Sequence, residues 1–217
     1  YDLSRDTIDA HPLRCPDPKA CQAFAELIQQ VQSEGDSVGG CIRCVVIAPP
    51  QGLGAPVFHK LEADLAAAML SIPAAKAFEL GSGFSGCHSR GSQQNDAFTL
   101  RAGRVRTTSN HSGGIQGGIS NGESIRLRVG FKPVSTIRHP QQTVSSEGSP
   151  QMLAPTSGRH DPCVLPRAVP IVEAMVNIVL LDHYLQNAAL HPKGPLTHPV
   201  AHTHKTETEL PVPPPKV

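Results

Sequence analysis

The segment from Pro166 to about Ala189 constrains the fold of this chain more than any other. Its apolar side chains cover most of the circumference of a helix: Ala168, Ile171, Val172, Met175, Val176, Val179 and Leu180. A surface helix is apolar along one stripe only, so a helix that is apolar nearly all round belongs in the interior of a fold. Because Arg167 and Glu173 interrupt the run, we do not expect a membrane span, which needs about 18 continuous apolar residues.

A second segment has the alternation of a half-buried strand. Ile125, Leu127, Val129 and Phe131 share one side, and Arg126, Arg128 and Lys132 share the other. Shorter β-branched or apolar runs predict strands at 41–47 and 74–80. The strands therefore have one face for a core and one face for solvent.

Helix boundaries are marked by capping residues and prolines. Asp17 followed by Pro18 predicts a helix start, and Gly35 ends that helix. Pro56 predicts the start of a second helix, with Leu61, Leu65 and Met69 on one face. The order helix–strand–helix–strand predicts an α+β domain built in layers.

Other stretches lack periodicity. Residues 81–122 are rich in Gly, Ser, Asn and Gln, and a long segment of this kind is usually functional or disordered. Residues 138–158 are polar and predict a loop. From His191 on, proline, histidine and threonine predict a disordered tail. We expect one domain over residues 1–190 and a tail over residues 191–217.

Composition excludes some classes of function. The 217 residues include 19 Lys and Arg against 18 Asp and Glu, a net charge of +1. That balance provides no general field for nucleic acid or an anionic membrane, and the absence of Trp argues against base stacking. Six cysteines without a signal peptide at the start predict reduced thiols in a cytoplasmic protein. Because the first residue is Tyr1, we expect the chain to begin partway through a longer protein.

Two apparent metal motifs are weak. Cys41 and Cys44 lie three apart on a predicted strand and would face opposite sides, so they do not form a ligand pair. The histidines at 198, 202 and 204 fall in the predicted tail, where no fold holds ligand geometry. We expect no metal site.

Three segments carry features of an anion or cofactor site. Residues 110–122 contain two Gly-Gly pairs, which allow the backbone to approach a flat ring or an anion, although a flexible turn is the alternative. Lys132 precedes Ser135 and Thr136, a set suited to phosphate, although the outer face of a sheet is often basic. Asp161 and Pro162 precede the long helix and predict its cap or, alternatively, a carboxylate tuned for proton transfer.

These segments resemble chorismate synthase. Residues 159–175 (RHDPCVLPRAVPIVEAM) are similar to the C-terminal signature of that family, and residues 112–122 and 132–136 are similar to its flavin-binding segments. Residues 71–79 and 91–96 are similar to two further segments. Five motifs in one order make the resemblance far more specific than a glycine pattern.

The resemblance implies a β–α–β sandwich with helices between antiparallel sheets, present here as a partial copy. It implies a lyase of the shikimate pathway and aromatic amino acid biosynthesis, which converts 5-enolpyruvylshikimate 3-phosphate to chorismate by 1,4-anti elimination of phosphate. The family requires reduced FMN, some members reduce it with NADPH, and homotetramers are usual. Neither nucleic acid nor a membrane is an expected partner.

Carried over by position, the resemblance implies an FMN site and a catalytic carboxylate. The implied FMN contacts are Pro73, Ala74, Gly117, Lys132, Pro133, Val134, Ser135, Thr136 and Arg159. Arg159 is also implied as a contact of the substrate, and Asp161 as the base that receives a ring proton. We expect glycines 113–118, Lys132 and the segment 159–161 to converge around one phosphorylated planar ligand.

One departure from the family is large. The family's N-terminal half carries a Ser-His-Gly motif, an arginine cluster and two catalytic histidines, and none of these stands in this sequence. We therefore expect a C-terminal portion of the enzyme that does not turn over alone. The alternatives are a non-catalytic module that binds flavin or phosphate, and a structural protein whose glycine segment is merely flexible.

Overall fold

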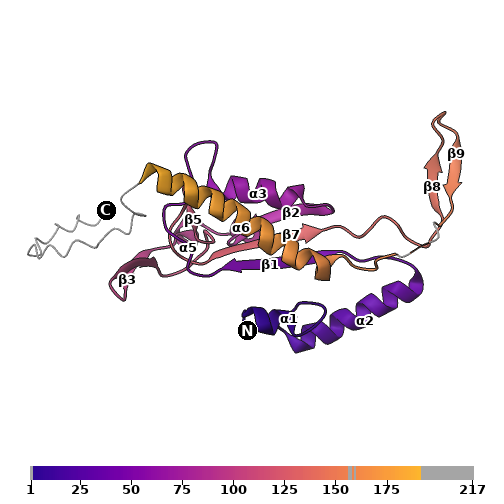
Figure 1. Ribbon diagram of the computed structural model, residues 1–217, viewed down its shortest axis with the longest axis horizontal. Helices are drawn as coiled ribbons and strands as arrows, with labels where there is room; N and C mark the ends of the chain where they lie inside the picture. Colours follow the sequence, from indigo (N-terminus) through magenta and orange to yellow (C-terminus); the bar gives the residue numbers. More distant parts are fainter. Residues whose placement is uncertain (1, 156–157, 159, 192–217) are drawn as a thin grey trace, which may run out of the picture.

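The computed structural model describes residues 2–155, 158 and 160–191. The predicted site residue Arg159 and nearly all of the predicted tail, residues 192–217, lie outside this part of the chain. Figure 1 shows an extended molecule in which two helices lie along one three-stranded sheet, with a hairpin far from the sheet at one end.

The sheet consists of β1 (Gly40–Val46), β7 (Ile125–Phe131) and β2 (Ala75–Leu80) in the order β1-β7-β2, and both pairings are antiparallel. Ile125, Leu127, Val129 and Phe131 are buried, as their alternation predicts. Cys41 and Cys44 point to opposite faces of β1, because Cys41 is exposed and Cys44 packs against the core. In the described residues, no group of His, Cys, Asp and Glu is arranged to hold a metal ion.

Helices α3 (Leu61–Ser71) and α6 (Leu165–Leu190) cover one face of this sheet (Figure 1). Leu61, Leu65 and Met69 of α3 are fully buried with Val172 of α6. The prediction that α3 begins at Pro56 was wrong, since Lys60 precedes its first turn and residues 55–59 form a bridged turn. The fixed φ of proline suits turns as well as helix starts, so Pro56 did not distinguish them.

Helix α6 is buried along one side only. Ala168, Val172, Val176 and His183 are buried, whereas Ile171, Ile178, Leu181 and Leu185 are exposed. By length and composition α6 could cross a membrane, contrary to our expectation, but its inner side packs on α3 and β1 as a core helix does. The fold is α+β with one sheet of a sandwich, and the opposite side of its central helix is uncovered in the described residues.

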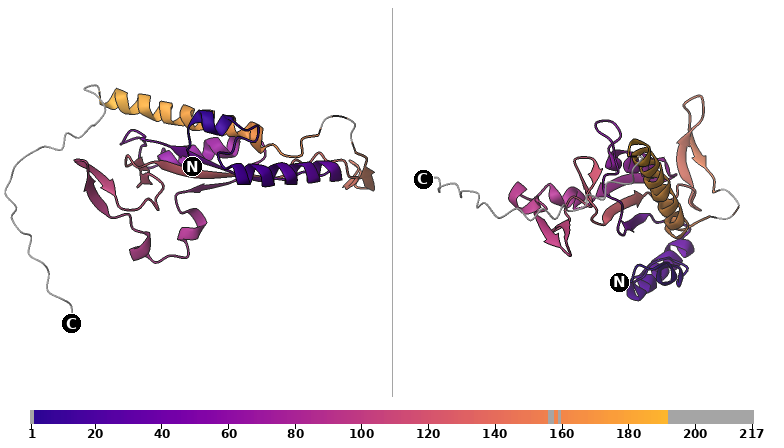
Figure 2. Two further views of the ribbon diagram at one scale, coloured as in Figure 1. Left: turned by 90° about the horizontal axis from the view of Figure 1, so that it is seen from below. Right: turned by 60° about the vertical axis from the view of Figure 1, so that its left-hand side comes forward.

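The N-terminal region forms α1 (Arg5–Asp9) and α2 (Pro18–Glu34) beside the sheet layer (Figure 2). The side chain of Asp17 accepts hydrogen bonds from the N–H groups of residues 19 and 20, and Gly35 ends α2 with a φ of 76°. Both boundaries are confirmed. Arg5 of α1 forms an ion pair of 3.0 Å with Glu173 of α6, which ties this region to the core.

The stretches without periodicity contain short elements. Between β2 and β7 lie α4 (Gly83–Gly86), α5 (Gly91–Gln94), β3 (Phe98–Arg101), β4 (Arg104–Thr107), β5 (Ile115–Gln116) and β6 (Ile119–Ser120). The predicted loop 138–158 instead contains a hairpin of β8 (Gln141–Val144) and β9 (Pro150–Leu153). Both of its faces are largely exposed, so its sequence lacks the alternation that marks a half-buried strand.

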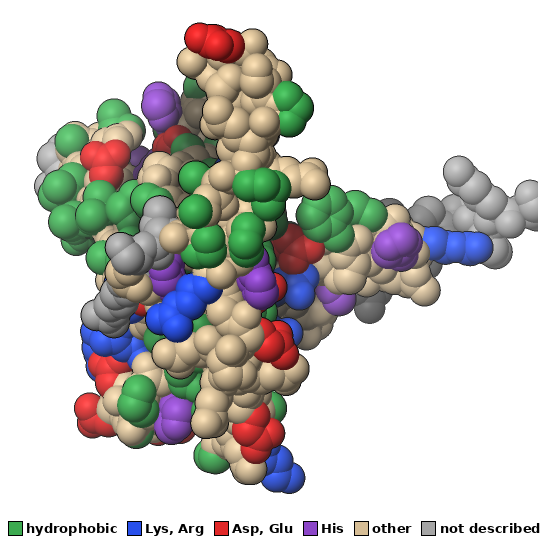
Figure 3. All heavy atoms as spheres, turned by 90° about the vertical axis from the view of Figure 1, so that its right-hand side faces the viewer, with side chains coloured by type: hydrophobic (Ala, Val, Ile, Leu, Met, Phe, Trp, Pro, Cys, Tyr) green, Lys and Arg blue, Asp and Glu red, His purple; other side chains and the backbone are tan. Residues whose placement is uncertain are grey.

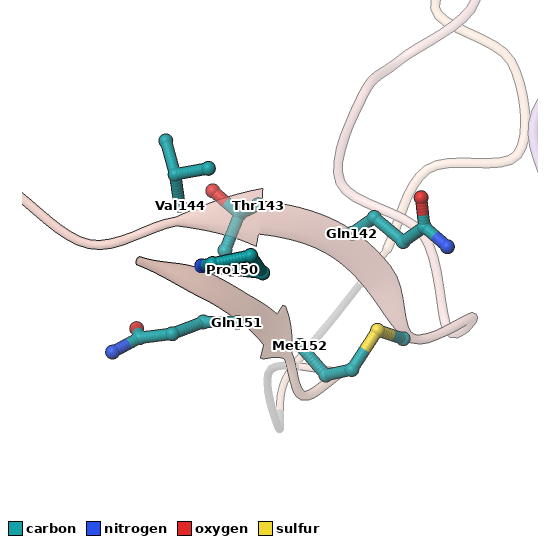
Figure 4. Close-up of a pocket in the computed structure, with 6 residues that line it drawn as sticks. All are labelled: Gln142, Thr143, Val144, Pro150, Gln151 and Met152. Carbon is teal, nitrogen blue, oxygen red and sulfur yellow. The ribbon is translucent and has the colours of Figure 1, made fainter. Parts of the chain in front are cut away.

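A hollow of about 640 Å³ lies against this hairpin and is lined by Gln142, Thr143, Val144, Pro150, Gln151 and Met152 (Figure 4). None of these side chains is charged or nucleophilic. The hollow therefore has no group that could perform acid–base chemistry or hold a phosphate.

Candidate functional site

The end of β7 brings several predicted site residues together. The N–H of Lys132 donates to the carbonyl of Ala74 over 2.9 Å, which places the Pro73–Ala74 turn beside the start of segment 132–136. The Ser37 hydroxyl donates to the carbonyl of Val134 over 2.5 Å, and the N–H of Val38 donates to the carbonyl of Pro162 over 2.8 Å. Residues 37–38 thus join the segment after β7 to the segment before α6.

The groups at this end of β7 are open to solvent. Lys132, Pro133, Ser135, Thr136 and Pro73 are exposed, and Ala74 and Val134 are half-buried. Lys132 forms no ion pair within the part of the chain that the structure describes. A free ammonium beside two hydroxyls is a donor set that fits a phosphate group. Figure 3 looks onto this end of the molecule and shows basic, acidic and histidine side chains close together below the hairpin.

Asp161 lies at the same end, in the segment that precedes α6. Its half-buried carboxylate forms an ion pair with Arg167, which is on the first turn of the helix. The capping role predicted for Asp161 and Pro162 was wrong, because α6 begins at Leu165 and Val164 is its N-cap residue. Pro166 is the proline of the first turn. Asp161 is therefore held by a side chain of α6.

The glycine segment has a structural explanation at each pair. Gly117 and Gly118, with φ of 61° and 91°, form the turn between β5 and β6, and a hairpin turn of two residues requires positive φ at both. At Gly113 a Cβ would lie 2.4 Å from the backbone N of Gly81. Gly113 is thus required by close packing, whereas Gly117 is exposed at the tip of its turn with open space above it.

Asp96 fixes the start of the glycine segment, and sequence reasoning placed it in a motif without a role. Its buried carboxylate accepts hydrogen bonds from the Ser109 hydroxyl (2.7 Å) and from the N–H groups of His111 and Ser112 (2.8 Å each). Burial by itself raises the pKa of Asp96, but these bonds outweigh it and lower the pKa to about 2. The carboxylate is ionised at neutral pH and holds the loop in one conformation.

Gly117 does not join the other predicted residues. Gly113 pairs with β7 at Arg126, while Lys132 follows Phe131 at the other end of the strand. Phe131 is five residue steps from Arg126, a distance of about 17 Å at the rise of a strand. Gly118 contacts Leu61 at the start of α3, and Ala74 follows the end of that helix. The expected convergence of all three segments was therefore wrong for a single chain: segments 73–74, 132–136 and 160–162 meet, and segment 113–118 lies apart.

Comparisons with known proteins agree on one family. The family model described as chorismate synthase matches residues 3–185. A chorismate synthase of Opitutus terrae is 59% identical over 186 residues, which cover 86% of this chain and 51% of the relative. One from a Synechococcus strain is 57% identical over 187 residues, which cover 86% of this chain and 49% of the relative. The chain spans about half the length of the curated relatives it matches.

A solved structure is similar as well. A crystal structure of chorismate synthase matches with a TM-score of 0.64 and 31% identity, over 80% of this chain and 45% of that chain. The likeness thus spans less than half of that chain.

Proposed function

This chain belongs to the chorismate synthase family, and from that premise we propose that it supplies the phosphate-holding and base-bearing part of a chorismate synthase site. The proposed reaction is the 1,4-anti elimination of phosphate from 5-enolpyruvylshikimate 3-phosphate, with reduced FMN, to give chorismate. The observation that carries the proposal is that residues 37–38 join the segment after β7, which holds Lys132 and the two hydroxyls, to the segment before α6, which holds Asp161.

Lys132 and its neighbours suit the phosphate end of FMN. The Lys132 ammonium acts as a point charge, and the hydroxyls of Ser135 and Thr136 donate hydrogen bonds. The Pro73–Ala74 turn and the Pro133–Val134 backbone would border the ligand, and Arg159 would contact both FMN and the substrate. Reduced FMN, when bound, would supply electron density to the elimination. These residues bind and orient, and the phosphate-holding donors keep the ligand in register with Asp161.

Asp161 is the proposed base. The adjacent guanidinium of Arg167 favours the ionised carboxylate, which is the form that accepts a proton. Asp161 Oδ2 accepts the proton lost from the substrate ring. Arg167 acts as a positioning residue, because its ion pair with Asp161 orients the carboxylate for that transfer.

The distance of Gly117 from Lys132 supports a homo-oligomer. Gly117 can contact FMN held at Lys132 only if the glycine turn comes from a second copy of the chain. A homotetramer, as is usual in the family, would supply such a copy. We also propose a cytoplasmic location and, as a source of reduced flavin, NADPH.

The openness of the site favours a second candidate function for the 217-residue chain taken alone. Lys132, Ser135 and Thr136 are exposed, and none of them lines the hollow at the β8–β9 hairpin or a second hollow bordered by Arg43, Arg126 and Arg128. Elimination chemistry of this kind depends on a site that excludes water. The chain by itself would then bind flavin or phosphate without turnover, as a non-catalytic module.

Titration of the protein with oxidised FMN, followed by flavin fluorescence, tests the binding role. Lys132→Ala should weaken FMN binding by about tenfold, the value of one charge-assisted contact. Lys19→Ala is the matched control, because Lys19 is an exposed lysine of α2 outside the site, and it should change the affinity less than twofold. Equal affinities for the wild type and Lys132→Ala would refute the phosphate role of this end.

A separate pair of measurements tests the chemistry. Asp161→Asn should retain FMN affinity within about twofold, since the carboxylate is assigned to proton transfer, and should form no chorismate in any assembly that is active with the wild type. The isolated 217-residue chain should form no chorismate above background with reduced FMN and 5-enolpyruvylshikimate 3-phosphate. Turnover by that chain would contradict the non-catalytic alternative.

A further inference from the structure

The sheet face turned away from α3 and α6 carries a hollow that the proposed function does not use. It measures about 380 Å³ and is bordered by Arg43 and Val45 of β1, by Arg126 and Arg128 of β7, and by Ser82 and Ser85 near α4. The alternation of the strands places the arginines here, because the residues between them point into the core. In Figure 2 the segment with α4 lies on the side of the sheet opposite α6. We call this site the outer-face hollow.

The outer-face hollow has more positive charge than the protein neutralises. Arg43 and Arg128 are directly opposite each other across β1 and β7, and Glu79 of β2 is opposite Arg128 on its other side. Glu79 forms an ion pair with Arg128. Among the described residues, neither Arg43 nor Arg126 has an acidic partner. Like charges directly opposite each other on a sheet destabilise it. Because one carboxylate neutralises only one of the three arginines, two positive charges remain that a bound anion could neutralise.

Ser82 adds a hydrogen-bond donor to this charge, whereas the Ser85 hydroxyl donates to the carbonyl of Ser82. The N–H of Ser82 donates to the carbonyl of His111 over 2.8 Å, which fixes its backbone. Its hydroxyl accepts from the side chain of Gln94 and so keeps its own proton for another acceptor. A rigid hydroxyl beside guanidinium groups is a donor set for an oxyanion with several oxygens.

We propose that the outer-face hollow binds the phosphate group of a small phosphorylated molecule, with Arg43 and Arg126 as its charged donors and Ser82 as a neutral one. Planar guanidinium groups match the paired oxygens of phosphate. The volume is that of a small-ligand site, and none of the bordering side chains is aromatic, which removes the stacking that single-stranded nucleic acid uses. The site is distinct from the Lys132 end, because Arg126 is at the opposite end of β7.

Calorimetric titration of the protein with inorganic phosphate and with pyrophosphate, at constant ionic strength, tests the proposal. Arg43→Gln and Arg126→Gln should each weaken pyrophosphate binding by about tenfold. Arg104→Gln, on the exposed β3–β4 hairpin, is the matched control and should change it less than twofold. Lys132→Ala separates the two sites: binding that disappears in Lys132→Ala and survives in both arginine variants would overturn the outer-face site and leave the proposed function intact.

Two further measurements distinguish a ligand site from a structural role. Without phosphate, Arg43→Gln should unfold at the same or a higher urea concentration than the wild type, because it removes the repulsion from Arg128. A clearly lower midpoint would mean that Arg43 serves the fold and would overturn the proposal. Binding of a single-stranded oligonucleotide in the absence of any pyrophosphate binding would overturn it as well.

Discussion

Asp96 is the residue whose removal should most affect the glycine segment. Asp96→Asn keeps the shape of the side chain and the acceptor Oδ1, which serves Ser109 and the N–H of His111. It replaces Oδ2, the acceptor of the Ser112 N–H, with an NH2 group, which donates hydrogen bonds and cannot accept one from that N–H. The variant therefore loses a charge-assisted hydrogen bond and leaves a half-buried N–H without an acceptor.

Two estimates of the folding stability that Asp96→Asn loses agree. The pKa of Asp96 is lowered from 3.8 to about 2 in the folded chain, which corresponds to about 2 kcal/mol of stability at pH 7. Loss of one bond to a charged group with an unsatisfied donor costs about 2 kcal/mol. Because the folded pKa is below the unfolded one, this stability is complete above about pH 5 and is lost as the pH falls towards 2. About half of it should remain at pH 3.

Urea denaturation at several pH values measures both quantities. The free energy of unfolding of Asp96→Asn should be about 2 kcal/mol below that of the wild type at pH 7, and the gap should close below pH 3. Asp182→Asn, an exposed carboxylate of α6, is the control and should lie within about 0.5 kcal/mol of the wild type at both pH values. A gap that is absent at pH 7, or that does not change with pH, would refute the assignment of Asp96 as the anchor of the loop.

The core, the glycines and the cysteines offer three further tests. Val172→Ala, at a fully buried position of α6, should lower the free energy of unfolding by about 2 kcal/mol, whereas Ile178→Ser on the exposed side should change it by less than about 0.5 kcal/mol; urea denaturation compares them. Gly113→Ala forces a Cβ against backbone at a φ of 66° and should cost about 3 kcal/mol in the same assay. Burial raises the pKa of Cys44 to about 11, so iodoacetamide at pH 8 should alkylate exposed Cys41 and leave Cys44 unmodified, as mass spectrometry of the peptides would show; equal labelling would contradict the packing of β1.

The parts of the fold that were predictable from sequence are those fixed by local chemistry and a single buried face. The alternation in β7 and the caps of α2 needed no long-range information. The β8–β9 hairpin was missed because it is exposed on both faces, which leaves no alternation. The start of α3 was misplaced because Pro56 suits a turn as well as a helix. The apolar circumference of α6 predicted a helix buried all round, but only one of its sides is buried among the described residues, and a sequence does not show which side is covered.

In the candidate site, too, the sequence did not predict which distant segments come together. Chemistry alone identified Lys132 and Asp161, and the structure brings their segments together through residues 37–38, which carried no signal of their own. The separation of Gly117 from Lys132 follows from the length of β7, because the loops before and after a strand emerge at its opposite ends. Once β7 was predicted as a strand of seven residues, a distance of about 20 Å between its two flanking loops was already implied by the rise per residue. Motif order along the chain therefore did not predict which segments lie close together.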